Sequence, residues 1–225
     1  MSGCRRIGAH VLAADRLHGD DTTVPVISAL AVEAGARFVA VSTVRDDVAS
    51  TAEAIDRLAR ESGADIIVST GGVSVGARDC IPAALQALGA QIRFHGVGMR
   101  PGKPVLFAIL PSGALFFGLP GNPFAAYVGF RFFVNSALRA MLGLAEERGV
   151  PLSADLPGRP GMTLIQKARV DVDREGRLVP VILAGQQSHM LRPLLEANAL
   201  VAIDGTGYGH SVRAFPISPS RGFDL

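Results

Sequence analysis

The stretch DIIVSTGGVSVGARD, residues 65–79, decides the fold class of this chain. It opens with the apolar run Asp65–Ser69, which is typical of a strand buried on both faces of a parallel sheet. A glycine-rich loop follows and leads directly into the helical pattern Ile81–Leu88, which ends at Gly89. Strand, glycine loop and helix in this order predict one unit of an α/β fold.

The same alternation extends on both sides of this unit, as far as residue 143. The predicted strands are Ile7–Leu12, Phe38–Val44, Ile92–Met99, Val105–Leu110 and Ala114–Leu119, the last two joined as a hairpin by Pro111–Gly113. The predicted helices are Val24–Ala34 after a Thr23 cap, a helix through Ile55–Ala59 that stops at Gly63, and Phe124–Leu142. This order predicts a three-layer, doubly wound, mostly parallel α/β domain over residues 5–145.

The residues after this domain have a different character. Pro151–Pro160 is rich in proline and glycine and is interpreted as a linker. Short β-rich runs separated by turn residues follow: Thr163–Val172, Leu178–Leu183, Leu200–Ile203 and Ser211–Ile217. They predict a small all-β domain over residues 150–217.

Composition and charge exclude several classes of protein. Of the 225 residues, 48% are hydrophobic and 19% are charged, so a sizeable core can form and disorder is not expected. The net charge of +2, without a run of lysine or arginine, argues against nucleic-acid binding. No apolar stretch approaches the roughly 20 residues that span a bilayer. Cys4 and Cys80 form no metal-ligand pattern, so we expect a cytoplasmic protein with two reduced thiols.

Three loops are expected at the carboxyl edge of the α/β sheet, where ligands of such folds bind. In the first, Ser69–Asp79, glycines allow backbone N–H groups to approach an anion, and the following helix start adds a positive dipole. This loop matches neither the P-loop nor the dinucleotide-binding fingerprint. A tight glycine turn with Asp79 as an ordinary helix cap would explain the same residues without a ligand.

The other two loops contain cations or begin a helix. In Arg100–Pro104, two prolines stiffen a loop that holds Arg100 and Lys103 ready for a phosphate or oxyanion, and a solvated charged turn is the alternative. Lys103 is one of only two lysines in the chain. Leu119–Pro123 begins the long helix, whose N–H groups can bind an anion, although Asn122 as a cap is a sufficient structural explanation.

Two aspartates follow the strand Phe38–Val44 at the same edge. A hard divalent cation such as Mg²⁺ would bridge Asp46 and Asp47 to the phosphate oxygens of a bound ligand. The alternative for this pair is a helix cap. His95, just before the cationic loop, is more typical of a packed strand histidine. Because all of these features fall on one sheet edge, they favour a shared ligand site.

Three motifs in this order make the sequence similar to a known family. Gly71–Gly76 with Asp79, then Arg100–Pro104, then Gly118–Pro123 resemble the molybdopterin-binding domain of the molybdopterin molybdotransferases, the MoeA and gephyrin E-domain family. The likeness runs from about Ile7 to Ile217, since the β-rich tail resembles the C-terminal β domain of that family. The chain is accordingly similar to the C-terminal part of these enzymes.

The resemblance implies a function in molybdenum cofactor biosynthesis. Members of the family insert molybdate into the dithiolene of adenylylated molybdopterin and release AMP, with the help of Mg²⁺ or another divalent metal. By position, the resemblance makes Asp46 and Asp79 metal-binding and catalytic residues, and Arg100 and Lys103 catalytic cations. It gives substrate-binding roles to Gly71, Gly72, Val73, Ser74, Gly76, Pro101, Gly102, Pro120, Gly121, Asn122 and Pro123.

The sequence departs from the family's pattern in three places. The first-strand motif Thr-Gly-Asp-Glu-Leu appears here as Ala-Ala-Asp-Arg-Leu, residues 13–17, so Arg16 replaces a functional glutamate. A second active-site lysine aligns with Gly96, beside His95. The two N-terminal domains of full-length members have no counterpart in these residues, so the expected partner is a second copy in a homodimer or another chain that supplies the missing domains. We therefore expect ligand recognition from this chain more than turnover.

Two alternative hypotheses stay open. The first is a non-catalytic molybdopterin-binding module, which Arg16, Gly96 and the missing domains favour. The second is a CinA-like nucleotide hydrolase or deamidase, which shares the Gly-Gly-Val-Ser loop. The β-rich tail and the Leu-Pro-Gly-Asn-Pro stretch favour the molybdopterin hypotheses. Those hypotheses make molybdopterin or adenylyl-molybdopterin the expected partner, without nucleic acid or membrane.

Overall fold

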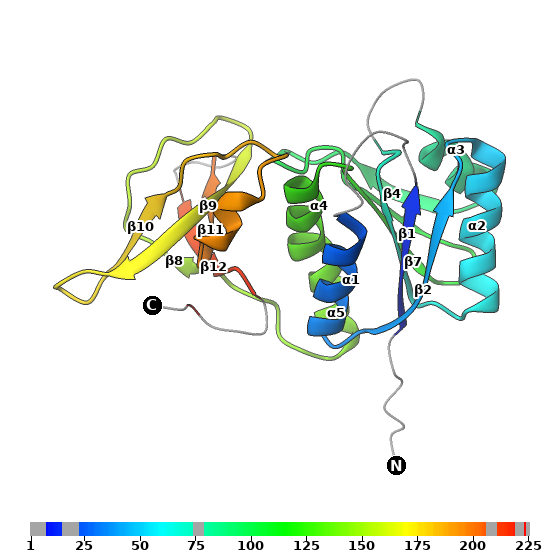
Figure 1. Ribbon diagram of the computed structural model, residues 1–225, viewed down its shortest axis with the longest axis horizontal. Coiled ribbons are helices and arrows are strands. Elements are labelled where there is room, and N and C mark those ends of the chain that lie inside the picture. The colour runs from blue at the N-terminus through cyan, green and yellow to red at the C-terminus, as the bar shows by residue number, and fades with distance from the viewer. Residues whose placement is uncertain (1–7, 15–22, 74–78, 206–210, 219–222, 224–225) are drawn as a thin grey trace, which may run out of the picture. The chain divides into compact units, whose positions relative to one another are not determined.

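A computed structural model describes residues 8–14, 23–73, 79–205, 211–218 and 223 (Figure 1). These residues divide into two compact units. The first contains the described residues up to Val97 and those from Pro104 to Ala145. The second contains Gly98–Lys103 and the described residues from Glu146 onwards. The cationic segment Gly98–Lys103 is therefore grouped with the C-terminal unit, although it lies within the range 5–145 that the sequence predicts for one domain.

The first unit is built on a six-stranded sheet. Its strands lie in the order β2 (Arg37–Val44), β1 (Gly8–Ala14), β3 (Ile66–Thr70), β7 (Leu115–Leu119), β6 (Leu106–Ile109) and β4 (Gln91–His95). The first four of these strands are parallel to one another, whereas β6 is antiparallel to both β7 and β4. The predicted mostly parallel sheet is confirmed, and so is the hairpin formed by β6 and β7.

Helices cover both faces of this sheet (Figure 1). One face carries α2 (Val48–Glu61) and α3 (Cys80–Ala87), and the other carries α1 (Thr23–Glu33), α4 (Pro123–Gly129) and α5 (Asn135–Met141). A π-helical segment, η1 (Phe130–Val134), joins α4 to α5. The long helix predicted from Phe124 to Leu142 is thus one helical run with a π segment inside it. Among the described residues, no helix is long and apolar enough to cross a membrane.

The main apolar core of this unit lies between the sheet and the helices α2 and α3. Ile55, Ile81 and Phe116 are completely buried there. Each such side chain contributes roughly 1.5–3 kcal/mol on burial. All five residues of β3 are buried as well, which explains the unbroken apolar run in the sequence. The core therefore fixes the strand from which the glycine loop emerges.

The second unit is a smaller, mainly antiparallel β sheet. Its strands lie in the order β10 (Leu178–Ile182), β9 (Thr163–Val172), β11 (Ala199–Asp204), β12 (Ser211–Pro216) and β8 (Val150–Pro151), and β5 (Met99–Arg100) pairs with β9 in parallel. A 3-10 helix, η2 (Arg192–Leu195), precedes β11. Val170, Val201 and Ala214 belong to its core. The predicted small β domain is confirmed as a fold.

Two boundaries differ from the sequence-based prediction. The strand expected over Ile92–Met99 ends at His95, because Gly96 adopts a φ of 95° that turns the chain out of the sheet. The stretch interpreted as a linker begins with the last residue of β8, which pairs with β12. The first boundary is set locally by Gly96, whereas the second depends on β12, more than 60 residues later in the sequence.

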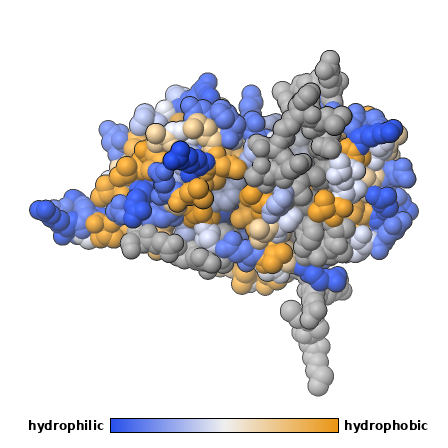
Figure 2. All heavy atoms as spheres, viewed as in Figure 1, coloured by the Kyte–Doolittle hydropathy of each residue, from blue (hydrophilic) through white to orange (hydrophobic). Residues whose placement is uncertain are grey.

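Apolar side chains are exposed on the second unit over β10 and η2 (Figure 2). Val179 and Val181 are 42% and 54% exposed, and Leu195 is 88% exposed. Their neighbours Leu178 and Ile182 pack against the core, so β10 alternates between the two faces of the sheet. The outer face of this edge strand therefore presents valines to its surroundings.

Candidate functional site

Four parallel strands of the first unit end at the same edge of the sheet. At the end of β1, Ala14 lies opposite Val44 of β2, and Ala13 lies opposite Thr70 of β3. Thr70 also lies opposite Leu119, the last residue of β7. The loops after β2, β3 and β7 therefore begin almost level with one another. The chain also passes from one side of β1 to the other between β2 and β3, and open α/β sheets bind ligands at such switch points.

The glycine loop begins at the end of β3 and is held there by the main chain. The N–H of Gly71 donates to the carbonyl of Leu119 at 2.9 Å. Gly71 and Gly72 have φ values of 85° and 68°, a backbone conformation that glycine adopts readily. Ser74 and Gly76, which the sequence also predicts as ligand contacts, lie outside the described residues.

Val73 is fixed in this loop from two sides. A Cβ at Gly118 would come within 2.4 Å of Val73 Cγ1, so the side chain of Val73 lies where only a glycine in β7 leaves room. From the end of β4, Nε2 of His95 lies 3.0 Å from the carbonyl oxygen of Val73, a hydrogen-bonding distance. His95 therefore bonds to the glycine loop, a contact that the sequence-based interpretation of a packed strand histidine did not predict.

The two aspartates after β2 have different partners. Oδ1 of Asp47 accepts a hydrogen bond from the N–H of Ser50 at 2.8 Å and caps α2. The hydrogen bonds from Ser50 lower the pKa of Asp47 below its usual value. Oδ1 of Asp46 instead accepts from Sγ of Cys80, the first residue of α3, at 3.2 Å. The helix cap that the sequence left open for the pair thus belongs to Asp47 alone.

Asp79 lies at the start of α3, next to Cys80. It occupies the N-cap position, but its side chain makes no capping bond. Burial raises the pKa of the Cys80 thiol above its usual value, so the thiol keeps its proton and can donate to Asp46. Asp46 is thus bonded to the first residue of α3, and Asp79 is the residue that precedes it in the chain.

The loop after β7 lies beside the glycine loop. A Cβ on Gly121 would be 3.7 Å from the Cα of Gly71, so the two loops are in contact. Asn122 occupies the N-cap position of α4 without a side-chain capping bond, and Pro123 fills the first turn. The sequence predicts Pro120–Pro123 as a ligand-binding loop, and the structure brings it next to Gly71.

The cationic segment is part of the second sheet. Arg100 lies opposite Leu164 of β9, and the N–H of Thr163 donates to the carbonyl of Gly98 at 2.8 Å. Arg100 and Lys103 are both exposed. The sequence-based placement of this loop on the first sheet missed the pairing with β9, because the two strands are separated by more than 60 residues.

The two ends of this segment are nevertheless joined within the first unit. The N–H of Gly96 donates to the carbonyl of Val105 at 2.9 Å, level with the end of β4 and the start of β6. Consecutive Cα atoms are 3.8 Å apart, so the Cα of Lys103 lies within roughly 7.6 Å of that of Val105. The cationic segment thus leaves the first unit after β4 and returns to it before β6.

The two acidic residues fit a magnesium ion that is shared with a ligand. Mg²⁺ is commonly bound by one or two carboxylates together with waters and substrate phosphates. Asp46 and Asp79 offer such a pair of hard oxygen donors. Among the described residues, no group of three or more His, Cys, Asp or Glu forms a complete metal site. Within the part of the chain that the structure describes, Asp46 and Asp79 alone therefore do not make a complete metal centre.

Comparison with known proteins decides the family. A model described as "Probable molybdopterin binding domain" matches residues 7–140, which is more than half of the chain. The chain belongs to the molybdopterin-binding domain family. A second model, described as "MoeA C-terminal region (domain IV)", matches residues 149–211. The resemblance inferred from the three motifs and the β-rich tail is confirmed, and the second match favours it over the CinA-like hypothesis.

Curated relatives of this molybdopterin-binding chain are longer than it is. A molybdopterin molybdenumtransferase of Bacillus subtilis (strain 168) is 31% identical over 210 residues, covering 90% of this chain and 48% of that protein. A protein of the same name from Nostoc sp. is 38% identical over 128 residues, covering 56% of this chain and 29% of that protein. The chain thus spans about half the length of the Bacillus protein. Its match to the Nostoc protein covers a smaller share of that protein.

A solved structure supports the fold of this molybdopterin-binding chain. The molybdopterin biosynthesis moea protein from Pyrococcus horikosii superposes with a TM-score of 0.68 at 18% identity, covering 97% of this chain and 56% of the other. At this identity the likeness concerns the fold alone. It includes the β unit as well as the molybdopterin-binding unit, because nearly the whole chain is covered.

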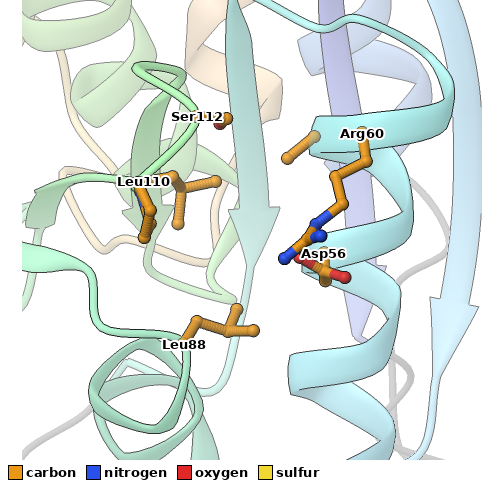
Figure 3. A pocket seen from close by; sticks show the side chains of 7 residues that line it. Asp56, Arg60, Leu88, Leu110 and Ser112 are labelled. Atoms are coloured by element: carbon orange, nitrogen blue, oxygen red, sulfur yellow. Dashed lines mark hydrogen bonds and ion pairs between the residues drawn. The ribbon is translucent and has the colours of Figure 1, made fainter.

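A pocket of the molybdopterin-binding unit lies at the opposite edge of the sheet (Figure 3). It measures about 330 Å³ and is lined by side chains of α2 and by residues that follow α3 and β6. On α2, Nε of Arg60 is 2.6 Å from Oδ1 of Asp56. Because β6 is antiparallel to β7, Leu110 at its end lies away from the carboxyl edge. None of the predicted site residues lines this pocket, so it is distinct from the candidate site.

Proposed function

We propose that the chain binds adenylylated molybdopterin at the carboxyl edge of the first sheet and takes part in inserting molybdate with release of AMP. The main support is the convergence of Asp46 and Asp79 at the start of α3, beside the glycine loop. The relatives named molybdopterin molybdenumtransferase support the same transfer. The function belongs to molybdenum cofactor biosynthesis, and we assign it to the cytoplasm.

Each part of the edge has a role in this proposal. The N–H groups of the two glycine-rich loops approach the phosphate oxygens, since the absence of a Cβ on Gly71 or Gly121 allows close contact. Asp46 and Asp79 hold a divalent ion, which when bound offsets the negative charge of pyrophosphate and molybdate. Arg100 and Lys103 add positive charge for the same oxygens. These roles position charged groups, and no covalent intermediate with the protein is required.

A matched set of asparagine variants tests this proposal. Asp46→Asn and Asp79→Asn are expected to weaken Mg²⁺-dependent binding of adenylylated molybdopterin by roughly tenfold or more, as the loss of a charge-assisted contact does. The free energy of unfolding of Asp79→Asn should change by no more than about 1 kcal/mol, because asparagine has the same shape and is as good a helix-capping residue as aspartate. Isothermal titration and thermal unfolding measure the two effects.

Asp47→Asn is the control for these variants. It removes the same charge one residue from Asp46, and asparagine also caps helices well. We expect its affinity for the ligand to remain within about twofold of the wild type, in line with a site that does not use this carboxylate. If all three variants lose affinity equally, the effect is one of net charge and the assignment of Asp46 and Asp79 is wrong. A variant that binds normally but unfolds early would make its aspartate a structural residue.

A second candidate is molybdopterin binding without turnover. It is favoured by Arg16, which stands in place of the family's glutamate. Arg16 lies outside the described residues. We expect the purified 225-residue chain to bind the ligand but to release AMP slowly with molybdate. Robust molybdate-dependent AMP release would exclude this candidate and leave the transferase.

A further inference from the structure

Cys80 connects three elements of the first unit. It is the first residue of α3, and its side chain is buried, with 5% exposure. Its Sγ lies 3.2 Å from Oδ1 of Asp46, in the loop after β2, and 3.4 Å from Oγ1 of Thr51, in the first turn of α2. Thr51 is 1% exposed. The thiol of Cys80 thus contacts both the buried hydroxyl of Thr51 and the exposed carboxylate of Asp46.

The directions of these two hydrogen bonds follow from the number of protons. A thiol has one proton to donate, and an ionised carboxylate can only accept. The S–H of Cys80 therefore donates to Asp46, and the hydroxyl of Thr51 is left to donate to Sγ. The alternative acceptor for that hydroxyl, the carbonyl of Arg45, lies at 3.5 Å, the longer of its two contacts. Donors arranged in series strengthen one another, so Thr51 supports the bond from Cys80 to Asp46.

We propose that Cys80 is a positioning residue of the candidate site and that its thiol orients the Asp46 carboxylate beside Asp79. This inference rests on the proposed function, in which the two carboxylates hold a divalent ion. An exposed carboxylate on a loop has several rotamers, and fixing one of them on binding costs free energy. A bond from a buried residue at the start of a helix fixes that rotamer before the ion arrives.

Binding of Mn²⁺ tests the proposal, because the free ion has an EPR signal that is lost on binding. Cys80→Ala removes the donor and is expected to weaken Mn²⁺ binding roughly three- to tenfold, the range that corresponds to one hydrogen bond. Cys80→Ser keeps a donor in the same place and should restore affinity to within about twofold. Thr51→Val keeps the shape of Thr51 without its hydroxyl and should produce a smaller loss than Cys80→Ala. Thermal unfolding confirms that each variant is folded.

A double-mutant cycle separates positioning from packing. If Cys80 acts through Asp46, the losses from Cys80→Ala and Asp46→Asn are not additive, and the double variant binds Mn²⁺ about as weakly as Asp46→Asn alone. Additive losses, or equal affinity in the wild type and Cys80→Ala, would overturn the inference while leaving the site intact. Equal affinity in the wild type and Asp46→Asn would instead remove the metal site of the proposed function, and with it the role of Cys80.

Discussion

Lys103 and Lys167 are the only two lysines of the chain, and their surroundings are opposite. Lys103 is exposed on the segment between β5 and β6, whereas Lys167 on β9 is completely buried. Nζ of Lys167 donates to the carbonyls of Gly185 and Met190 at 2.7 and 2.8 Å, and to that of Gln187 at 3.3 Å. The ammonium of Lys167 thus holds the loop after β10, while that of Lys103 remains accessible to a ligand.

The two lysines are equally rare in the sequence, but they have different surroundings. The groups that a charged side chain contacts therefore indicate its role better than the rarity of the residue type does. Buried polar side chains of the second unit bind their own main chain. Gln186, for example, exchanges hydrogen bonds with the main chain of Lys167 and also donates to Leu183. At the edge of the first sheet, by contrast, the Asp46 carboxylate is exposed while it accepts a hydrogen bond from Cys80. We therefore expect substitutions in the first group to affect stability and those in the second to affect binding.

The largest effect is expected for Lys167→Met. Methionine fills a similar volume but removes the ammonium that donates to three carbonyls, and hydrogen bonds from a charged group contribute more than neutral ones. The free energy of unfolding should fall by about 3–5 kcal/mol, which chemical denaturation measures. Affinity of the folded variant for adenylylated molybdopterin should stay near that of the wild type. A loss of stability under about 1 kcal/mol would contradict the structural role of Lys167, because its hydrogen bonds would then not stabilise the loop after β10. The contrast with Lys103 would then be wrong.

Lys103→Met should have the reverse profile. An exposed lysine contributes little to stability, so unfolding should be unchanged within about 0.5 kcal/mol. If its ammonium meets a phosphate or molybdate oxygen, the affinity for adenylylated molybdopterin should fall by roughly 1–3 kcal/mol. Affinity of the wild type should also decrease as salt is raised, and less so in the variant. Equal affinity of wild type and variant across salt concentrations would remove Lys103 from the site.

The smallest expected effect is a pH dependence of the free energy of unfolding, which tests whether the ammonium of Lys167 is buried. Burial lowers the pKa of Lys167 from its usual value of 10.5. Between the lowered value and 10.5, the unfolded chain binds more protons than the folded chain, so this group makes stability rise with pH. The difference in unfolding free energy between wild type and Lys167→Met should therefore grow from neutral pH towards 10.5. A difference that shrinks over this range would contradict burial of the ammonium.

Much of the fold could be predicted because its signals are local. The buried strand β3 begins with the apolar run Ile66–Val68, and β9 occupies the predicted range Thr163–Val172 because turn residues flank it. The roles of polar residues could not be predicted in the same way. Asp46 and Asp47 both precede α2 at capping distance, and only the position of Cys80, 34 residues away, separates them. Lys167 gives no signal in sequence, since its acceptors are main-chain carbonyls 18 to 23 residues later.

The segment Gly98–Lys103 also has a consequence for how this protein can be divided. The chain passes from one unit to the other at residues 97–98, 103–104 and 145–146, so three covalent connections join the units where a simple tandem pair has one. A fragment ending at residue 145 would keep Arg100 but lose Thr163 and Leu164, the residues with which its segment pairs. An exchange of one unit that leaves the other intact would therefore separate β5 from β9 unless the segment Gly98–Lys103 is exchanged with the second unit.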